Sequence, residues 1–521
     1  MLLNDLATAS AEVTKTASRL RKTSAMATAL RQAGPGEIEL AAHYLGGTLR
    51  QRRTGVGWRS LQVLPPAAAE PSLTIGEVDA ALQAMAEASG AGSQKRRSEL
   101  LEGLLSRATP GEQRYLVGLL TGELRQGALD GVLLDAVAEA AGVPGPLVRR
   151  AAMMAGSTPL IAEAALTGGA DALSRYDLKV GAGVRPMLAS SAKTVGEAMA
   201  KVAPRGGDVA VEAKLDGIRV QAHKDGDDVR VFSRSLDDLT ARLPGVVDAV
   251  RAIDATTAIL DGEALLLEGS GRPAAFQDTA SRGATRTAAP PEVSDVDEGA
   301  LTPWFFDLLY LDGRSLVDLP LRERSALLAE RTPARFMIER TVTDLSAVAE
   351  AFNEHVLAQG HEGVVVKNLD APYDAGRRGA GWVKVKPVHT LDLIVLAVEW
   401  GGGRRRGKLS NIHLGARDDE TGAWVMLGKT FKGMTDEMLA WQTERFLELE
   451  ERRDGYTVYL RPEQVVEIAF DGLQRSTRYP GGLALRFARL LRYRDDLGPD
   501  DVDTMATVRQ FALRSGEGPE A

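Results

Sequence analysis

The segment Glu212-Ala213-Lys214-Leu215-Asp216-Gly217-Ile218-Arg219 sets one lysine between two apolar, strand-forming flanks. Glu212 precedes Lys214 by two residues, so both side chains share one face of a strand. Asp216-Gly217 is a common turn pair, so the segment alone carries little information about chemistry. Taken in isolation, Lys214 is better explained as a surface lysine at a strand edge. Its interpretation depends on what the rest of the chain supplies.

Five further segments follow in order, each a strand-like run that carries a charged or aromatic side chain. Glu263 and Glu362 are carboxylates beside glycines at strand ends. Lys384 and Lys386 alternate along one strand, which directs both to one face. The segments are Phe232-Ser233-Arg234-Ser235, Leu260-Asp261-Gly262-Glu263, Trp304-Phe305-Phe306-Asp307-Leu308-Leu309-Tyr310, Glu362-Gly363-Val364-Val365-Val366-Lys367 and Trp382-Val383-Lys384-Val385-Lys386.

Length and composition limit the classes of protein to which the chain can belong. The chain has 521 residues, enough for three or four domains, and 44% of them are hydrophobic. It contains no cysteine, which excludes disulfides, cysteine–zinc sites and thiol nucleophiles. It also lacks an uncharged apolar run long enough to span a bilayer and a signal-peptide pattern at its N-terminus. These features predict a cytoplasmic protein without a membrane partner.

The first 180 residues are predicted to be helical. Apolar residues recur at three-to-four spacing, as in Leu100, Leu101, Leu104 and Leu105. Thr109-Pro110-Gly111-Glu112 is typical of a capped helix start. These patterns predict an all-α domain over residues 1–183.

The character changes near residues 181–186, where short β-rich runs begin to alternate with helices. From about residue 390, several short strands and one helix suit a small barrel such as an OB-fold. The predicted fold is therefore multidomain α+β. Its predicted parts are the helical domain 1–183, an α+β domain 184–389, an OB-fold β-barrel 390–513 and a disordered tail 514–521. Predicted strands are 208–213, 218–224, 229–233, 258–267, 303–310, 363–367, 382–386, 391–398, 411–416, 423–429, 464–470 and 484–494; predicted helices are 243–253, 321–330, 345–358 and 435–450; residues 284–300 are predicted to form an exposed loop.

Six segments in this order resemble the motifs of ATP-dependent DNA ligases, which belong to the covalent nucleotidyltransferase superfamily. The resemblance extends to the helical stretch 119–127 and to the basic tract 486–496, so it covers most of the chain. It implies that Lys214 attacks the α-phosphorus of ATP and holds AMP through a phosphoramidate. The amine must be neutral to attack, so burial or nearby cations such as Lys384 and Lys386 must act on it.

The resemblance also implies an ATP-binding set. Glu212 would lie near the adenine edge, and Phe306 would stack on the purine, although one of Phe305 and Phe306 must be a core residue by alternation. Arg219 and Arg234 would contact ribose and phosphate, but either would equally suit a structural ion pair with an acid. Arg377 competes with Arg378 for the phosphate role. The full set is Glu212, Arg219, Arg234, Glu263, Phe306, Arg378, Lys384 and Lys386.

Two carboxylates near a triphosphate suit Mg²⁺, which takes oxygen ligands and keeps several waters. By resemblance, Glu263 contacts ribose or metal and Glu362 assists metal binding, and Mn²⁺ can substitute for Mg²⁺. The alternative is a pair of surface acids at strand ends.

The chain has a net charge of −8, but arginines cluster in two of its segments. Residues 400–417 and 472–494 contain no acid and suit either a phosphate-binding face or plain solvated surfaces. Residues 402–409 nearly match a P-loop, but Leu409 cannot supply the metal-binding hydroxyl. By resemblance the C-terminal tract orients pyrophosphate, with Ala488 and Leu497 departing from the usual proline and lysine. The predicted DNA or pyrophosphate contacts are Arg404, Arg405, Arg406, Arg486, Arg489 and Arg492.

The resulting expectation is a monomeric, bacterial, magnesium-dependent DNA ligase that seals nicks in duplex DNA, with ATP as co-substrate and replication or repair proteins as partners. An RNA ligase or capping enzyme is disfavoured by the long helical region. An NAD-dependent ligase is disfavoured by the absence of a cysteine-based zinc site. A nick-binding module without catalysis is disfavoured by Lys214.

Overall fold

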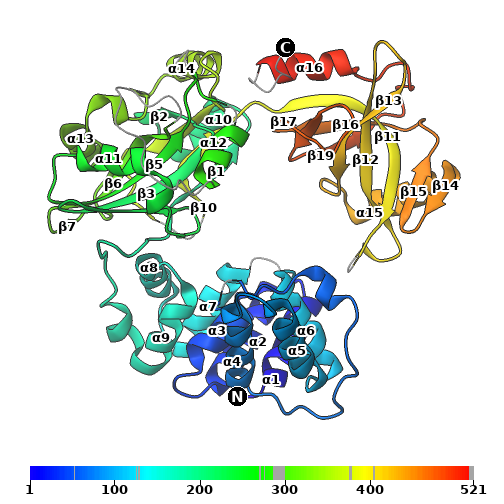
Figure 1. The fold of residues 1–521 in the computed structure, drawn as a ribbon. Coiled ribbons are helices and arrows are strands. Elements are labelled where there is room, and N and C mark those ends of the chain that lie inside the picture. Colours follow the sequence, from blue (N-terminus) through cyan, green and yellow to red (C-terminus); the bar gives the residue numbers. More distant parts are fainter. Residues whose placement is uncertain are drawn as a thin grey trace.

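The structure, a computed structural model, describes residues 1–51, 53–124, 126, 129–268, 272–274, 276–284, 300–374, 378–402 and 405–514. Most of the predicted loop 284–300, nearly all of the predicted tail and Arg404 lie outside these ranges, and only the backbone of Arg378 is described. Three lobes succeed one another along the chain, from the helical N-terminal part to the strand-rich C-terminal part (Figure 1). No helix within the described ranges combines the length and apolar character needed to cross a bilayer.

The N-terminal lobe is all helical, as predicted. One hydrophobic core runs through it, and α2 packs against α7 while α9 packs against α3, α7 and α8. The Thr109 hydroxyl accepts from the Glu112 amide, and the Glu112 carboxylate accepts from the Thr109 amide at 2.8 Å, so the predicted cap is a capping box. The elements are α1 (Leu3–Lys15), α2 (Arg19–Gln32), α3 (Ile38–Leu45), η1 (Trp58–Leu61), α4 (Ile75–Glu87), α5 (Ser93–Ser106), α6 (Pro110–Thr121), α7 (Leu129–Ala141), α8 (Gly145–Ala155) and α9 (Thr158–Leu173).

The central lobe contains two five-stranded sheets, ordered β1-β10-β9-β2-β8 and β4-β3-β5-β6-β7. The chain crosses from one sheet to the other between β2 and β3, at residues 214–217. Every residue of β2 is buried. The elements are β1 (Leu188–Ala192), α10 (Val195–Val202), β2 (Val209–Ala213), β3 (Ile218–Asp225), β4 (Asp228–Ser233), η2 (Thr240–Arg242), α11 (Pro244–Arg251), β5 (Thr257–Leu265), α12 (Phe276–Ala284), β6 (Thr302–Leu311), β7 (Arg314–Ser315), α13 (Leu321–Arg331), η3 (Ala334–Phe336), β8 (Arg340–Thr343), α14 (Ser346–Ala358), β9 (Val364–Asn368) and β10 (Arg378–Val385).

The connection between the helical and central lobes is fastened to β3 by two buried side chains. The Gln221 amide donates to the Val184 carbonyl at 2.9 Å and accepts from the Val184 N–H at 2.7 Å. His223 accepts the Gly181 N–H on Nδ1 at 3.0 Å, and its Nε2 lies 2.9 Å from Gln221 Oε1. Because Nδ1 accepts, Nε2 carries the proton and donates it to Gln221.

The C-terminal lobe is OB-like but not a closed barrel. Its main sheet follows β13-β12-β11-β15-β14, with β16 pairing β11 and β19, and the strand pairing among the described residues does not return to form a ring. The predicted strand 484–494 is wrong in one respect: Phe487 has φ 54° and divides it into β18 and β19. The elements are β11 (His389–Trp400), β12 (Leu409–Arg417), β13 (Trp424–Thr430), α15 (Asp436–Glu448), β14 (Glu450–Asp454), β15 (Thr457–Leu460), β16 (Val465–Phe470), β17 (Gly472–Arg475), β18 (Leu483–Arg486), β19 (Arg489–Tyr493) and α16 (Met505–Arg514).

Candidate active site

Lys214 lies directly after β2, where the chain leaves one sheet for the other. Its backbone is tied to the segment before β9, since the Lys214 N–H donates to the Gly363 carbonyl at 2.7 Å and the Glu362 N–H donates to the Lys214 carbonyl at 3.0 Å. The Lys214 ammonium contacts the Glu362 carboxylate. The side chain of Lys214 is 22% exposed, so it remains reachable from solvent.

Two glycines permit this close approach of backbones. A Cβ on Gly217 would lie 2.4 Å from the Ala264 carbonyl oxygen, and one on Gly363 would lie 2.3 Å from the Val385 carbonyl oxygen. Gly363 also has φ +130°, which L side chains rarely adopt. The glycine of the K-x-D-G segment is therefore required for packing of the crossing against β5.

The charge of the Lys214 ammonium acts on three carboxyl groups, but only that of Glu362 is in contact with it. Burial raises the pKa of Glu263 to about 7, and its Oε1 accepts the Gly217 N–H at 3.3 Å. Burial, and then the Glu362 charge, raises the pKa of Asp216. For Glu362, burial raises the pKa, but the ammonium groups of Lys214 and Lys386 lower it by more. The site therefore combines three carboxyl groups with its own two lysines.

Lys386 approaches the same carboxylate from the end of β10. Its ammonium lies 3.4 Å from Glu362 Oε1 and 2.7 Å from Asp471 Oδ2 of the C-terminal lobe. Lys384 lies within β10, half-buried and opposite Val365 of β9. Lys384 thus lies inside β10, whereas Lys386 follows the end of that strand.

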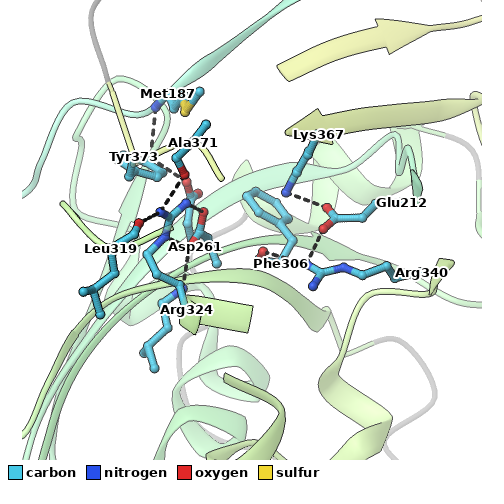
Figure 2. Close-up of polar contacts among 12 residues, drawn as sticks. Met187, Glu212, Asp261, Phe306, Leu319, Arg324, Arg340, Lys367, Ala371 and Tyr373 are labelled. Atoms are coloured by element: carbon cyan, nitrogen blue, oxygen red, sulfur yellow. Dashed lines mark hydrogen bonds and ion pairs between the residues drawn. The ribbon is translucent and has the colours of Figure 1, made fainter. Parts of the chain in front are cut away.

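Glu212 is buried beneath the site, with two cations around its carboxylate (Figure 2). Arg340 of β8 contacts Oε1, and Lys367 of β9 contacts Oε2. The Lys367 ammonium also lies 4.5 Å from the centre of the Phe306 ring. Burial lowers the pKa of Lys367, and the charge of Glu212 opposes that effect. The Glu212 side chain is thus held in place from two sides.

Phe305 is the core residue of the pair and Phe306 is only partly buried, which agrees with the alternation expected for β6. Arg219 is engaged in the structural ion pair that the sequence left open. Its guanidinium donates to both oxygens of Asp261 at 3.0 and 2.7 Å, and the Tyr373 hydroxyl donates to the same carboxylate at 2.7 Å. Its Cζ also lies 5.5 Å from the Phe306 ring centre.

A second buried ion pair supports the strand that carries Phe306. The Arg324 guanidinium donates to both oxygens of Asp307 at 2.8 and 3.0 Å, and both side chains are 0% exposed. Arg324 also donates to the carbonyls of Leu319 and Ala371 (Figure 2). Its hydrogen bonds thereby join β6, α13 and the loop before β10.

The predicted arginine contacts are dispersed. Arg486 contacts the segment that carries Lys214, with Nη1 3.0 Å from Asp216 Oδ2. Arg492 pairs with Glu467 on β16, which places it on the face of its own lobe. Arg405 donates to the Phe431 carbonyl at 2.6 Å. Exposed side chains away from these pairs are Arg234, Arg406 and Arg489. Arg404 and the Arg378 side chain lie outside the described residues.

Comparison with known proteins agrees with this geometry. Residues 59–138, 186–386 and 405–497 match models of the DNA ligase N terminus, the ATP dependent DNA ligase domain and the ATP dependent DNA ligase C terminal region, respectively. The chain is 59% identical to a "Probable DNA ligase" of Beutenbergia cavernae, over 98% of this chain and 100% of that one. It is 57% identical to a "Probable DNA ligase" of a Nocardioides species, over 98% and 99%.

The chain belongs to the ATP-dependent DNA ligase family. A solved structure named Pmar-Lig_PreS3 shares 19% identity over 94% of this chain and 99% of that one, with a TM-score of 0.62, and has the same overall fold. The motifs indicate most residues of the candidate site but not the residues that form ion pairs within it. Arg340 and Lys367 belong to this group, as do Asp261 and Asp307, although Lys367, Asp261 and Asp307 each lie within a quoted motif.

Proposed function

We propose that this ligase seals nicks in duplex DNA in three steps that begin at Lys214. In the first, Nζ forms a bond to the α-phosphorus of ATP, the bond from that phosphorus to the bridging oxygen breaks, and pyrophosphate leaves. AMP then moves from Nζ to the 5′-phosphate of the nick. Attack by the 3′-hydroxyl on that phosphate joins the strand and releases AMP. The observation that carries the proposal is the convergence of Glu263, Glu362 and Lys386 on Lys214 from separate segments.

The nucleophile has to lose a proton before it attacks. Lys214 is partly exposed, so the proton can leave to water. Lys386, which faces the same carboxylate as Lys214, would meet the phosphates as a point charge. Lys384 on the adjacent stretch of β10, and Arg378 at the start of that strand, are proposed as further phosphate contacts.

The base and ribose would be bound on the other side of Lys214. Glu212, fixed by Arg340 and Lys367, would accept from the adenine edge, and the exposed part of Phe306 would pack on the ring. Arg219 would act on the nucleotide while still paired with Asp261, and Arg234 from the turn after β4.

Magnesium is the proposed cofactor, with Mn²⁺ as a substitute. No cluster of three or more His, Cys, Asp or Glu ligands occurs in the described ranges. Mg²⁺ bound with a nucleotide needs no such cluster, because one or two carboxylates and the phosphates suffice. Glu263 and Glu362 supply carboxylate oxygens near Lys214 and fit this requirement. When bound, the metal would neutralise charge that develops on the phosphates.

Nicked duplex DNA would contact the helical domain and the arginine-bearing surface of the C-terminal domain, chiefly through phosphates, because nicks occur in any sequence. Arg405, Arg406, Arg489 and Arg492 are the proposed contacts there, and Arg404, which lies outside the described residues, is a further candidate.

The test is covalent labelling. Incubation with ATP labelled at the α-phosphate and magnesium should leave label on the wild-type protein and none on Lys214→Ala. A nicked DNA duplex should then be sealed, and one with RNA strands sealed poorly. Unlabelled wild-type protein would sink the enzyme assignment, and undiminished label on Lys214→Ala would sink the assignment of the lysine.

A further inference from the structure

Helix α12 of the central domain contacts strand β17 of the C-terminal domain through three polar interactions. The side-chain amide of Gln277 donates to the Arg475 carbonyl and accepts the Arg475 N–H, both at 3.0 Å. The Asp278 carboxylate pairs with the Arg475 guanidinium. Gln277 thus pairs with both the N–H and the carbonyl of a strand residue, as a neighbouring strand would. This pair of hydrogen bonds fixes the orientation of the contact.

The same strand belongs to a hairpin that carries a charged residue into the site. β17 pairs with β18, with Gly472 opposite Arg486 and Arg475 opposite Leu483. Arg486 reaches Asp216, two residues after Lys214, and its Cζ lies 4.8 Å from the centre of the Phe276 ring at the start of α12. Holding Arg475 on α12 therefore fixes where Arg486 stands relative to Lys214.

We propose that Gln277 and Asp278 are positioning residues that seat the β17–β18 hairpin for adenylylation of Lys214. This inference rests on the proposed function. Neither side chain has a contact with Lys214 among the described interactions, so they would act through Arg486. The effect should be confined to the first step, because later steps have no pyrophosphate leaving group for the C-terminal arginines to orient.

The test compares two reactions of the full-length protein. One is the initial rate of lysyl-AMP formation from labelled ATP and magnesium. The other is sealing of a nick whose 5′-phosphate already carries AMP. In Gln277→Ala combined with Asp278→Ala, we expect the first rate to fall about tenfold, as removal of about 1.4 kcal/mol of interaction would produce. We expect the second rate to stay at the wild-type value.

Asp370→Ala is the matched control, because it removes an exposed aspartate that pairs with Arg322 in the same domain, away from this contact. It should leave both rates unchanged. An unchanged lysyl-AMP rate in the double variant would overturn the proposal, and so would an equal loss in both reactions, which indicates general damage. Wild-type protein that forms no lysyl-AMP would instead refute the proposed function.

Charge reversal adds a direct test of the pairing. Asp278→Arg should slow lysyl-AMP formation, and adding Arg475→Asp should restore most of the rate; failure to restore it would count against the contact.

A crosslink tests the same contact from the opposite direction. The chain has no cysteine, so Asp278→Cys with Arg475→Cys can be joined by a short bis-maleimide without reaction at any native thiol. The joined protein should still form lysyl-AMP, and loss of that activity would overturn the proposal.

Discussion

His223 should make the connection between the helical and central domains sensitive to acid. Its Nδ1 accepts the Gly181 N–H. A proton on Nδ1 would remove that hydrogen bond and leave two N–H donors facing each other. Burial, with a smaller contribution from Arg230, lowers the pKa of His223 from 6.5 to about 4. The unfolded chain therefore binds a proton between these values while the folded chain does not, and stability falls as pH falls through this window.

The two pKa values give the size of the effect. Between pH 7.5 and pH 5 the folded state should lose about 2 kcal/mol through this residue, approaching about 3.4 kcal/mol below pH 4. In His223→Gln, which cannot take up a proton, this part of the pH dependence should vanish. The remaining groups titrate equally in both proteins and cancel from the difference.

Hydrogen exchange of peptides covering β3 and β5, corrected for intrinsic rates, measures the opening free energy of each protein at each pH. The gap between wild type and His223→Gln should change by about 2 kcal/mol over this range. A gap that stays constant with pH would contradict this prediction, since it would mean that His223 titrates alike in both states.

Gly217→Ala puts a methyl group against the Ala264 carbonyl oxygen, and we expect it to lower stability by about 1–3 kcal/mol, seen as a lower midpoint of thermal unfolding; a wild-type midpoint would contradict the packing argument. Arg324→Met leaves the buried Asp307 carboxylate without its ion-pair partner and should destabilise the central domain by about 3–5 kcal/mol in urea denaturation. Adding Asp307→Asn, which removes the charge, should recover part of that loss, and a further loss would argue against a charge effect. Affinity for nicked DNA should fall linearly on a plot of log K against log salt, measured by fluorescence anisotropy, and a flat plot would argue against phosphate contacts.

The sequence predicted elements well where the signal was local. The strands around Lys214 and the capping box at Thr109 depend on neighbours within a few residues, and both lie where the pattern indicated. The openness of the C-terminal sheet depends on which distant strands pair, and no local pattern reports that. The break at Phe487 is a left-handed φ at a residue type that does not signal one.

The same division holds for the candidate site. Motif spacing identified Lys214, Glu263 and Glu362, and the structure brings these side chains together. Glu212 was also identified, but its partner Arg340 lies 128 residues away on a strand with no distinguishing motif. For Arg219 the sequence left nucleotide contact and ion pairing open, and only the three-dimensional structure identifies Asp261 as its partner.

The covalent link between the central and C-terminal domains comprises only residues 386–388, between the end of β10 and the start of β11. Three extended residues span about 10 Å. A partner held on so short a tether meets its binding surface at an effective concentration of about millimolar or more. An exposed ion pair and a pair of side-chain amide hydrogen bonds are too weak to join two separate proteins. On this tether, such contacts can keep the domains docked for most of the time. Contacts of this strength would also break readily, so the C-terminal domain could leave and rejoin its binding surface while the linker keeps it close.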